Sequence, residues 1–329
     1  MGLLINTAFG LYCPQADVYL DPWKPVNKAI ISHGHADHAR WGSVSYLCTT
    51  SAAPVIKYRL GDINLETMAF GEEKRINGVS FSFHPAGHIL GSAQIRVSYK
   101  GEVVVFSGDY KTVNDGFSES FESVKCHTFI TESTFGLPIY HWTDQKIVFN
   151  EIEEWCSNNK KNGHLSILYA YSLGKAQRIL QGISENAGPF YTHGTIEAVL
   201  KVMRNQGISL KNTIQINENT TRTELLNGLI LAPPAAQNSN WLKKFEPVRQ
   251  GIVSGWMALR GARRRRNADK GFVLSDHADW KGLNDAIVLT GAENVFVTHG
   301  YTDILSRWLQ DKGLNALPLE TNFEGDEIL

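Results

Sequence analysis

The stretch SHGHADHARWG, residues 32–42, holds four side chains that can bind metal within six positions, namely His33, His35, Asp37 and His38. Each is polar and needs a partner wherever it is buried, so burying all four for a purely structural role would be costly. Side chains alternate along an extended segment, which points His33 and His35 the same way, and Gly34 allows a close turn. Asp37 and His38 are expected to begin the next helix and to face a second point. The stretch therefore predicts ligands for two neighbouring cations.

Five apolar runs elsewhere in the chain are typical of buried strands, and each leads into an acid or a histidine. The runs are residues 29–31, 103–106, 129–130, 272–274 and 295–297, and the polar residues that follow them are His33, Asp109, Glu132, Asp276 with His277, and His299. Strand ends that meet at one edge of a sheet would gather these groups into a single site.

Two further positions can complete the ligand sets. His88, in the stretch HPAGHILGS, and Asp109, in FSGD, can close the first site with His33 and His35. The carboxylate of Asp109 has two oxygens and can bridge both cations, and His299 would complete the second site with Asp37 and His38. Imidazole ligands with a shared carboxylate favour zinc, with manganese as a plausible substitute.

The middle of the chain has a different pattern. Strand-like and helix-like segments alternate without acids or histidines at the strand ends, apart from His193, which predicts βαβ units and a largely parallel sheet. We therefore expect an α/β protein in which residues 144–262 form an inserted domain. Residues 1–143 and 263–329 are expected to form the discontinuous outer domain.

Composition sets further limits. The chain has 329 residues, a net charge of −1 and 43 % hydrophobic residues, so no global basic field indicates nucleic acid. No apolar run is long enough to span a membrane, and the first residues lack the basic region of a secretory signal. The four scattered cysteines are typical of reduced thiols, so a cytoplasmic protein is expected.

Several motifs resemble a known family. SHGHADH, PAGHILGS, FSGD and VTHG resemble the metal motifs of the metallo-β-lactamase fold, and ITESTFG, YSLGKAQ and LSDHADW resemble those of its β-CASP nuclease branch. The resemblance runs from about residue 21 to residue 299, nearly the whole chain. The wider contexts GLYCPQADVYLDPWKPV and SGWMALRGARRRR look most like the bacterial ligase-associated DNA exonucleases.

This resemblance implies an αββα sandwich with an inserted β-CASP domain. It implies that Asp21 orients the histidine loop, and that one metal is held by His33, His35, His88 and Asp109. The second metal is then held by Asp37, His38, Asp109 and His299. Asp37, Glu132 and His277 are implied in catalysis, with His277 as the general acid and Glu132 as its support.

The implied activity is that of a metal-dependent phosphodiesterase, a DNA exonuclease directed to the 5′ end of single strands in end processing and repair. Two divalent cations would lower the pKa of a bridging water and neutralise the phosphate oxygens. A DNA ligase and a helicase of the same repair system are the implied partners, and no membrane is involved.

Two stretches are expected to bind the substrate. Ser172 and Lys175, in YSLGKAQ, lie at a predicted strand-to-helix turn, where backbone N–H groups and the helix dipole favour a terminal 5′-phosphate. The stretch RGARRRR is expected to hold the phosphate backbone, because arginine forks suit phosphates. Its arginines are Arg260, Arg263, Arg264, Arg265 and Arg266.

Other functions stay open at this point. His299 is present as in the RNA-processing branch, whereas the DNA cross-link repair branch lacks the corresponding histidine, so a β-CASP ribonuclease is the alternative. A non-catalytic scaffold subunit should have lost metal ligands, and none is missing here. A small-molecule hydrolase would need neither the inserted domain nor His277 nor the arginine run.

Overall fold

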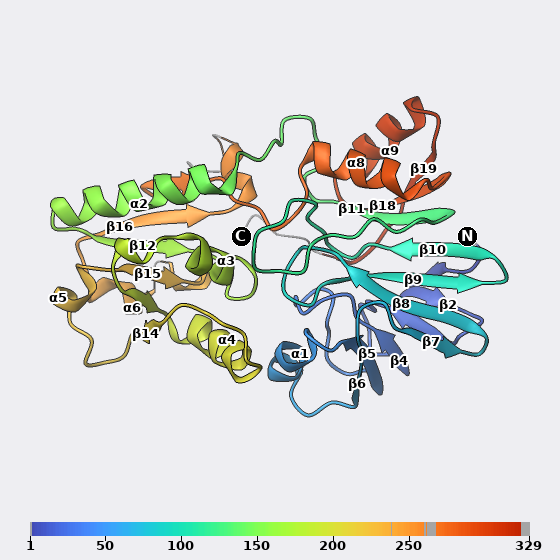
Figure 1. Cartoon of the computed structure of the whole chain (residues 1–329), viewed down its shortest axis with the longest axis horizontal. Helices are drawn as coiled ribbons and strands as arrows, with labels where there is room; N and C mark the ends of the chain where they lie inside the picture. Colours follow the sequence, from blue (N-terminus) through green and yellow to red (C-terminus); the bar gives the residue numbers. More distant parts are fainter. Residues whose placement is uncertain (1, 238, 260, 262–267, 324–329) are drawn as a thin grey trace. The chain divides into compact units, whose positions relative to one another are not determined.

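The chain folds into two compact units, drawn in Figure 1. The computed structural model describes residues 2–237, 239–259, 261 and 268–323. Unit 1 comprises Met1–His141 and His277–Glu327, and unit 2 comprises Trp142–Asp276. Unit 2 is thus inserted into unit 1, and the chain returns to unit 1 at a later residue than the boundary at 263 that the sequence suggested.

The first sheet of unit 1 has six strands in the order β1-β2-β3-β4-β5-β6. They are Ile5–Thr7, Gly10–Cys13, Val18–Leu20, Lys28–Ile30, Ser45–Thr49 and Leu65–Met68. The first three strands are antiparallel, and β3 to β6 run parallel. Helix α1, Ala53–Leu60, connects β5 to β6, as the crossover between parallel strands requires.

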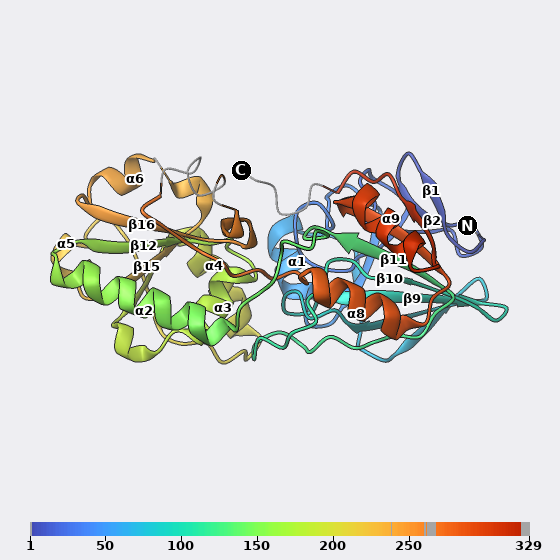
Figure 2. The same ribbon diagram turned by 90° about the horizontal axis from the view of Figure 1, so that it is seen from above.

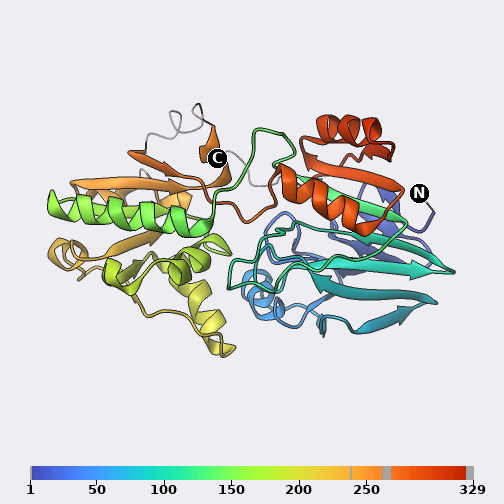
Figure 3. The same ribbon diagram turned by 45° about the horizontal axis from the view of Figure 1, so that its top comes forward.

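The second sheet of unit 1 has seven strands in the order β19-β18-β11-β10-β9-β8-β7. In chain order they are Glu73–Ile76, Val79–Pro85, Ala93–Tyr99, Glu102–Phe106, Thr128–Ser133, Asn294–Gly300 and Asn315–Pro318. Strands β7 to β10 are antiparallel, and β10, β11, β18 and β19 are parallel. Helices α8, Trp280–Thr290, and α9, Thr302–Asp311, lie on one face of this sheet (Figure 3).

The two sheets face each other across one hydrophobic core. Leu11 and Leu20 of the first sheet pack in the same buried cluster as Phe81, Phe83 and Ile95 of the second. Phe81 and Phe83 alternate with serines along β8, so both aromatic side chains point to the same side of the sheet. A sandwich of two sheets follows from this shared core.

Helices cover the outer faces of both sheets. Ile56 and Leu60 of α1 pack with Tyr46 of β5, on the outside of the first sheet. On the second sheet, Leu283 of α8 and Leu305 of α9 belong to one buried cluster with strand residues of β11 and β18. The prediction of an αββα sandwich is therefore confirmed.

Unit 2 contains a parallel sheet in the order β14-β13-β15-β12-β16-β17, flanked by helices (Figure 2). In chain order its strands are Leu165–Tyr169, Phe190–Thr192, Thr213–Gln215, Leu229–Ala232, Val248–Val253 and Lys270–Phe272. Its α-helices are α2, Gln145–Lys161; α3, Lys175–Gly182; α4, Gly194–Asn205; α5, Arg222–Leu225; and α6, Asn240–Lys243. Short 3₁₀ turns span Glu185–Ala187, Pro234–Ala236 and Gly255–Ala258. The α/β class predicted for the inserted segment is confirmed.

Two local expectations were wrong. The residues after His35 do not begin a helix. The N–H of Ala39 donates to the carbonyl of His35 at 2.9 Å, which closes a single turn. The Arg40 side chain then donates a hydrogen bond to the carbonyl of Asp37. The strand before His277 also differs, because β17 pairs with β16 in unit 2 and residues 273–276 lead from it to His277. An apolar run predicts a buried strand without specifying which sheet it joins.

None of the helices formed by the described residues is both long enough and apolar enough to span a bilayer.

The four cysteines generate a first prediction. All four are buried and none forms a disulfide. Burial raises the pKa of Cys48 to about 12, of Cys126 to about 11 and of Cys156 to about 12. Because the thiolate is the reactive form, we expect these three thiols to react slowly with a chromogenic disulfide reagent at about pH 8 in the folded protein. In denaturant all four should react at once, and fast labelling of the folded chain would contradict the burial.

Candidate metal centre

The predicted ligands come from three connections and one strand of unit 1. His33, His35, Asp37 and His38 lie on the loop between β4 and β5, and His88 lies on the turn between β8 and β9. Asp109 follows the end of β10, and His299 is part of β18. The structure clusters all of these ligands except Asp37, which lies beside His38 at the edge of the cluster, because strand ends from both sheets of the sandwich meet there.

Asp21 anchors the histidine loop at both ends. Its carboxylate accepts hydrogen bonds from the Ser32 backbone N–H at 2.7 Å and from the Ser32 hydroxyl. The same carboxylate lies 2.7 Å from His38 Nδ1. Asp21 is fully buried, and burial raises its pKa while the bonds from His38 and Ser32 lower it. The arrangement fixes the His38 ring so that its other nitrogen faces the ligand cluster.

Four residues form the first set of ligand atoms. The Nδ1 atom of His35 lies 3.2 Å from Nε2 of His33 and 3.0 Å from Nε2 of His88. Asp109 Oδ2 lies 3.5 Å from His33 Nε2 and 3.8 Å from His88 Nε2. One ligand atom from each of the four lies within 4.8 Å of the others. Three imidazoles and a carboxylate that converge in this way could hold a divalent cation.

The second set shares Asp109 with the first. His38 Nε2 lies 3.5 Å from Asp109 Oδ2 and 3.5 Å from Asp37 Oδ2. On the other side of the carboxylate, His299 Nε2 lies 3.1 Å from Asp109 Oδ1. One carboxylate therefore faces histidines of both sets, as a bridging ligand must.

Buried polar atoms that lack hydrogen bonds indicate whether this ligand cluster fits a cation. Within the described residues, His38 Nε2, Asp109 Oδ1 and His299 Nε2 are buried and form no well-aligned hydrogen bond, although His299 Nε2 lies 3.1 Å from Asp109 Oδ1. Such atoms are expensive unless something else binds them. Burial disfavours the charged form of His38, but Asp109 and Asp37 outweigh it and raise the His38 pKa well above its usual range. The cluster therefore demands positive charge, and the donor set fits divalent metal.

His277 and Glu132 form a separate pair beside this cluster. The Nδ1 atom of His277 lies 2.9 Å from each carboxylate oxygen of Glu132, and both side chains are buried. Glu132 also accepts a hydrogen bond from the Tyr110 backbone N–H at 2.7 Å. The His277 ring lies 4.5 Å, centre to centre, from the ring of His88. A carboxylate at Nδ1 keeps the proton on that nitrogen and orients the ring.

Sequence reasoning missed two residues that shape the centre. Phe323 stacks on the His38 ring at 4.4 Å between centres and 7° between planes, and its ring lies 5.7 Å from that of His299. Arg59 of α1 donates a hydrogen bond to the carbonyl of Gly34 inside the histidine loop. No motif marks either residue, because each reaches the loop only through the fold.

The predicted 5′-phosphate residues lie in unit 2. Ser172 is half-buried, with its hydroxyl 3.5 Å from that of Thr195. Lys175 begins α3 as expected, but its side chain is fully buried. Its ammonium lies 3.4 Å from Asp276 Oδ2 and 4.9 Å from the centre of the Tyr171 ring. A phosphate would have to compete with Asp276 for this charge.

The predicted arginine run, Arg260, Arg263, Arg264, Arg265 and Arg266, lies outside the described residues.

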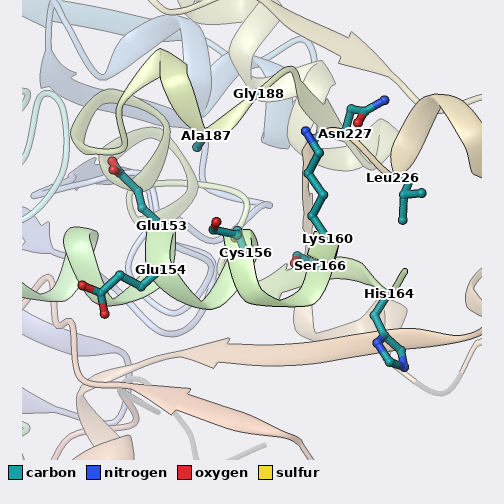
Figure 4. Close-up of a pocket in the computed structure, with 12 residues that line it drawn as sticks. Glu153, Glu154, Cys156, Lys160, His164, Ser166, Ala187, Gly188, Leu226 and Asn227 are labelled. Atoms are coloured by element: carbon teal, nitrogen blue, oxygen red, sulfur yellow. The ribbon is translucent and has the colours of Figure 1, made fainter. Parts of the chain in front are cut away.

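Unit 2 also contains a cavity of about 360 Å³ between α2 and the turn before β15 (Figure 4). Lys160 extends from α2 toward Asn227, and Glu153 and Glu154 lie on the same helix. The described lining includes none of the predicted site residues. The cavity is therefore separate from the metal centre.

Comparison with known proteins supports the same family. No family model matches the chain. A "Probable DNA ligase" of Opitutus terrae is 28 % identical over 95 % of the chain, which corresponds to 30 % of the ligase. An "RNase J-like protein" of Methanocaldococcus jannaschii is 29 % identical over 53 % of the chain and 48 % of its own length. A "Probable RNase MJ4" of the same organism is 21 % identical over 89 % of the chain and 87 % of its own length.

The fold and these relatives agree with the resemblance of the chain to the β-CASP branch of the metallo-β-lactamase-fold nucleases. The chain spans less than a third of the Opitutus ligase and about half of the RNase J-like protein. A crystal structure of a protein of unknown function from Enterococcus faecalis has a TM-score of 0.59 and 10 % identity, covering 90 % of this chain and 80 % of the other. That likeness concerns the fold alone.

The contacts of Lys175 predict a structural role. We expect Lys175→Met to lower the free energy of unfolding by about 2–3 kcal/mol, because it removes one partner of a buried carboxylate. The exposed Lys201→Met on α4 is the matched control and should leave stability unchanged. Denaturant unfolding measures both. Unchanged stability together with a selective loss of cleavage at 5′-phosphorylated ends would instead favour the terminal-phosphate role.

Proposed function

We propose that the chain is a dinuclear-metal phosphodiesterase, a DNA exonuclease that acts from the 5′ end of single strands in end processing and repair. The observation that carries this proposal is the position of Asp109. Its Oδ2 faces His33, His38 and His88, and its Oδ1 faces His299 at 3.1 Å. A buried carboxylate shared by two histidine sets suits a pair of cations better than one.

The proposed ligands follow these two sets. His33, His35, His88 and Asp109 hold the first cation, and Asp37, His38, Asp109 and His299 hold the second. Zinc is the preferred metal for this imidazole-rich set, with manganese as the alternative. When bound, such a pair lowers the pKa of water and neutralises phosphate oxygens during in-line attack. Asp21 orients His38 through the hydrogen bond at Nδ1.

His277 acts as the general acid in this proposal. Glu132 holds Nδ1 through both of its oxygens, so the opposite side of the ring faces away from that carboxylate. Protonated His277 can then give a proton to the departing sugar oxygen. Asp37 takes part in catalysis as well, as a carboxylate next to His38 in the second set.

The preference for DNA is supported by the ligase of Opitutus terrae, part of which is similar to nearly the whole chain. A DNA ligase is accordingly the proposed partner, together with a helicase of the same repair system. The proposed location is the cytoplasm, which agrees with four cysteines that form no disulfide. The arginine run remains a proposed backbone contact, and Ser172 a proposed contact of the terminal phosphate.

A β-CASP ribonuclease is the second candidate. Two relatives from Methanocaldococcus jannaschii are named as RNases or RNase-like proteins, and one of them aligns over 87 % of its own length. His299 supports this candidate, because it lies in the second ligand set. A scaffold subunit or a small-molecule hydrolase has less support, because all seven proposed ligands are present and clustered in this chain.

The decisive experiment compares end-labelled DNA and RNA of the same sequence, with 5′-phosphate or 5′-hydroxyl ends, in zinc and in manganese. We expect faster removal of nucleotides from 5′-phosphorylated single-stranded DNA. Asp109→Asn should lose both activity and metal content, since it weakens ligation to both cations, whereas the exposed Asp62→Asn should lose neither. Faster cleavage of RNA would favour the ribonuclease, and stoichiometric metal in Asp109→Asn would contradict the shared ligand.

His277→Ala separates proton transfer from metal binding. We expect it to retain its metals and to lose about 10²- to 10⁴-fold in kcat on oligonucleotides, which is the usual contribution of a general acid. On a p-nitrophenyl phosphodiester the loss should be much smaller, because p-nitrophenolate departs without a proton. Metal analysis and both assays on one preparation test this. Loss of metal in the variant would show that His277 is itself a ligand.

A further inference from the structure

A second feature of unit 1 lies directly beside the proposed metal ligands. A pocket of about 360 Å³ opens between the histidine loop and the end of α1. Its walls include Asp37, Arg40, Trp41 and Arg59, and the remaining lining is aliphatic. Asp37 is shared with the second ligand set, so whatever fills this pocket lies next to the site of cleavage. We call these four residues with their aliphatic neighbours the Trp41 pocket.

Trp41 exposes an unusually large apolar surface. Its side chain is 72 % exposed, although burying an indole is normally favourable. An exposed tryptophan in a pocket with charged walls is typical of a binding surface rather than of packing. The indole offers a flat face of the kind on which nucleic-acid bases stack.

The backbone around Trp41 is held in place. The hydroxyl of the buried Tyr46 donates to the carbonyl of Arg40 at 3.0 Å and accepts from the N–H of Ser43 at 2.8 Å. Gly42 has φ +107°, and a Cβ there would lie 2.9 Å from Pro25 Cγ, so the chain makes a close turn after the tryptophan. The Tyr46 hydroxyl thus binds the backbone on both sides of Trp41 and fixes the turn that carries the indole.

Two arginines line the same pocket as the indole. Arg59 donates to the carbonyl of Gly34, and Arg40 donates to the carbonyls of Asp37 and Asn322 at 3.1 and 2.9 Å. Among the described residues, no carboxylate forms an ion pair with either guanidinium within 4.0 Å. Each guanidinium has five N–H donors, so donors remain for a phosphate.

We propose that the Trp41 pocket binds a nucleotide of the substrate strand next to the scissile phosphate. The base stacks on Trp41, and the phosphodiester group contacts Arg59 and Arg40. This inference rests on the proposed nuclease function. It adds a substrate-binding site that is formed by residues of unit 1 alone. Stacking is tolerant of sequence because every base has a π face, so the contact suits an exonuclease that must accept every base in turn.

The test measures binding and turnover separately. Anisotropy of a short fluorescein-labelled DNA single strand reports affinity, and the matched probe is an abasic strand of the same length. We expect Trp41→Ala to weaken binding of the normal strand by about 10- to 100-fold, the usual effect of removing a stacking platform, and to leave the abasic strand unchanged. Trp41→Phe should restore part of the loss. Tyr58→Ala, an exposed aromatic of α1 outside the pocket lining, is the control.

The arginines should respond differently from Trp41. Arg59→Gln should weaken both strands alike and reduce the salt dependence of binding, because it removes a positive charge that faces a phosphate and removes no base contact. Lys57→Ala, an exposed basic residue on the same helix, is the matched control. Metal content is measured in every variant, because Arg59 also contacts the histidine loop.

The outcomes separate this inference from the proposed function. Equal effects of Trp41→Ala on normal and abasic strands, or no effect on either, would overturn the stacking platform. Wild-type activity on a p-nitrophenyl phosphodiester, which lacks a base, reports the metal centre. Metal content and the unfolding temperature report the centre and the fold without any substrate, and Trp41→Ala should leave both unchanged. Loss of metal or of folded protein in the variant would make Trp41 structural and overturn the inference. A wild-type protein that cleaves neither substrate but binds DNA through Trp41 would refute the nuclease and keep the pocket.

Discussion

A carboxylate that is completely removed from water must find hydrogen-bond donors, and Asp21 finds them at the two ends of the histidine loop. Ser32 lies near the start of the loop and His38 lies within its single turn, so the buried acid fixes both at once. Gly108 lies against Ser32, and a Cβ there would be 2.7 Å from the Ser32 hydroxyl. Asp109 is the next residue. The position of the shared carboxylate therefore depends on the same local packing that holds the loop.

The chain passes from unit 2 to unit 1 directly before His277, the residue that pairs with Glu132. His277 belongs to unit 1, and the preceding Asp276 belongs to unit 2. There Asp276 lies 3.1 Å from Arg178 Nη1 and 3.4 Å from the Lys175 ammonium, and all three side chains are buried. A buried acid with two cationic partners holds the backbone firmly at the residue before His277. These contacts lie within unit 2 and fix its last residue before the chain returns to unit 1.

Much of the site was predictable because its ligands are dense in the sequence. His33, His35, Asp37 and His38 share one loop, and buried strands lead into Asp109 and His299, so their convergence follows from the way strand ends meet at one edge. The αββα sandwich and the α/β nature of the insertion were predictable in the same way, from hydrophobic runs and their spacing. The turn after His35 could not be predicted in this way. Only one backbone hydrogen bond, from Ala39 to His35, forms there, and the Arg40 side chain donates to the Asp37 carbonyl that a continuing helix would use.

The sequence by itself determined the chemistry of this protein, that is, which side chains can bind metal and the order in which strands carry them. The tertiary structure decided what the other polar and aromatic residues do. Lys175 has the sequence context of a phosphate-binding lysine, yet the fold buries it against Asp276. Trp41 is a large apolar residue, yet the fold leaves it 72 % exposed in a pocket that Arg40 and Arg59 also line. Whether a side chain is buried, and which group it contacts, depends on which segments pack together. Lys175 and its partner Asp276 are about a hundred residues apart, and no local sequence pattern indicates such a contact.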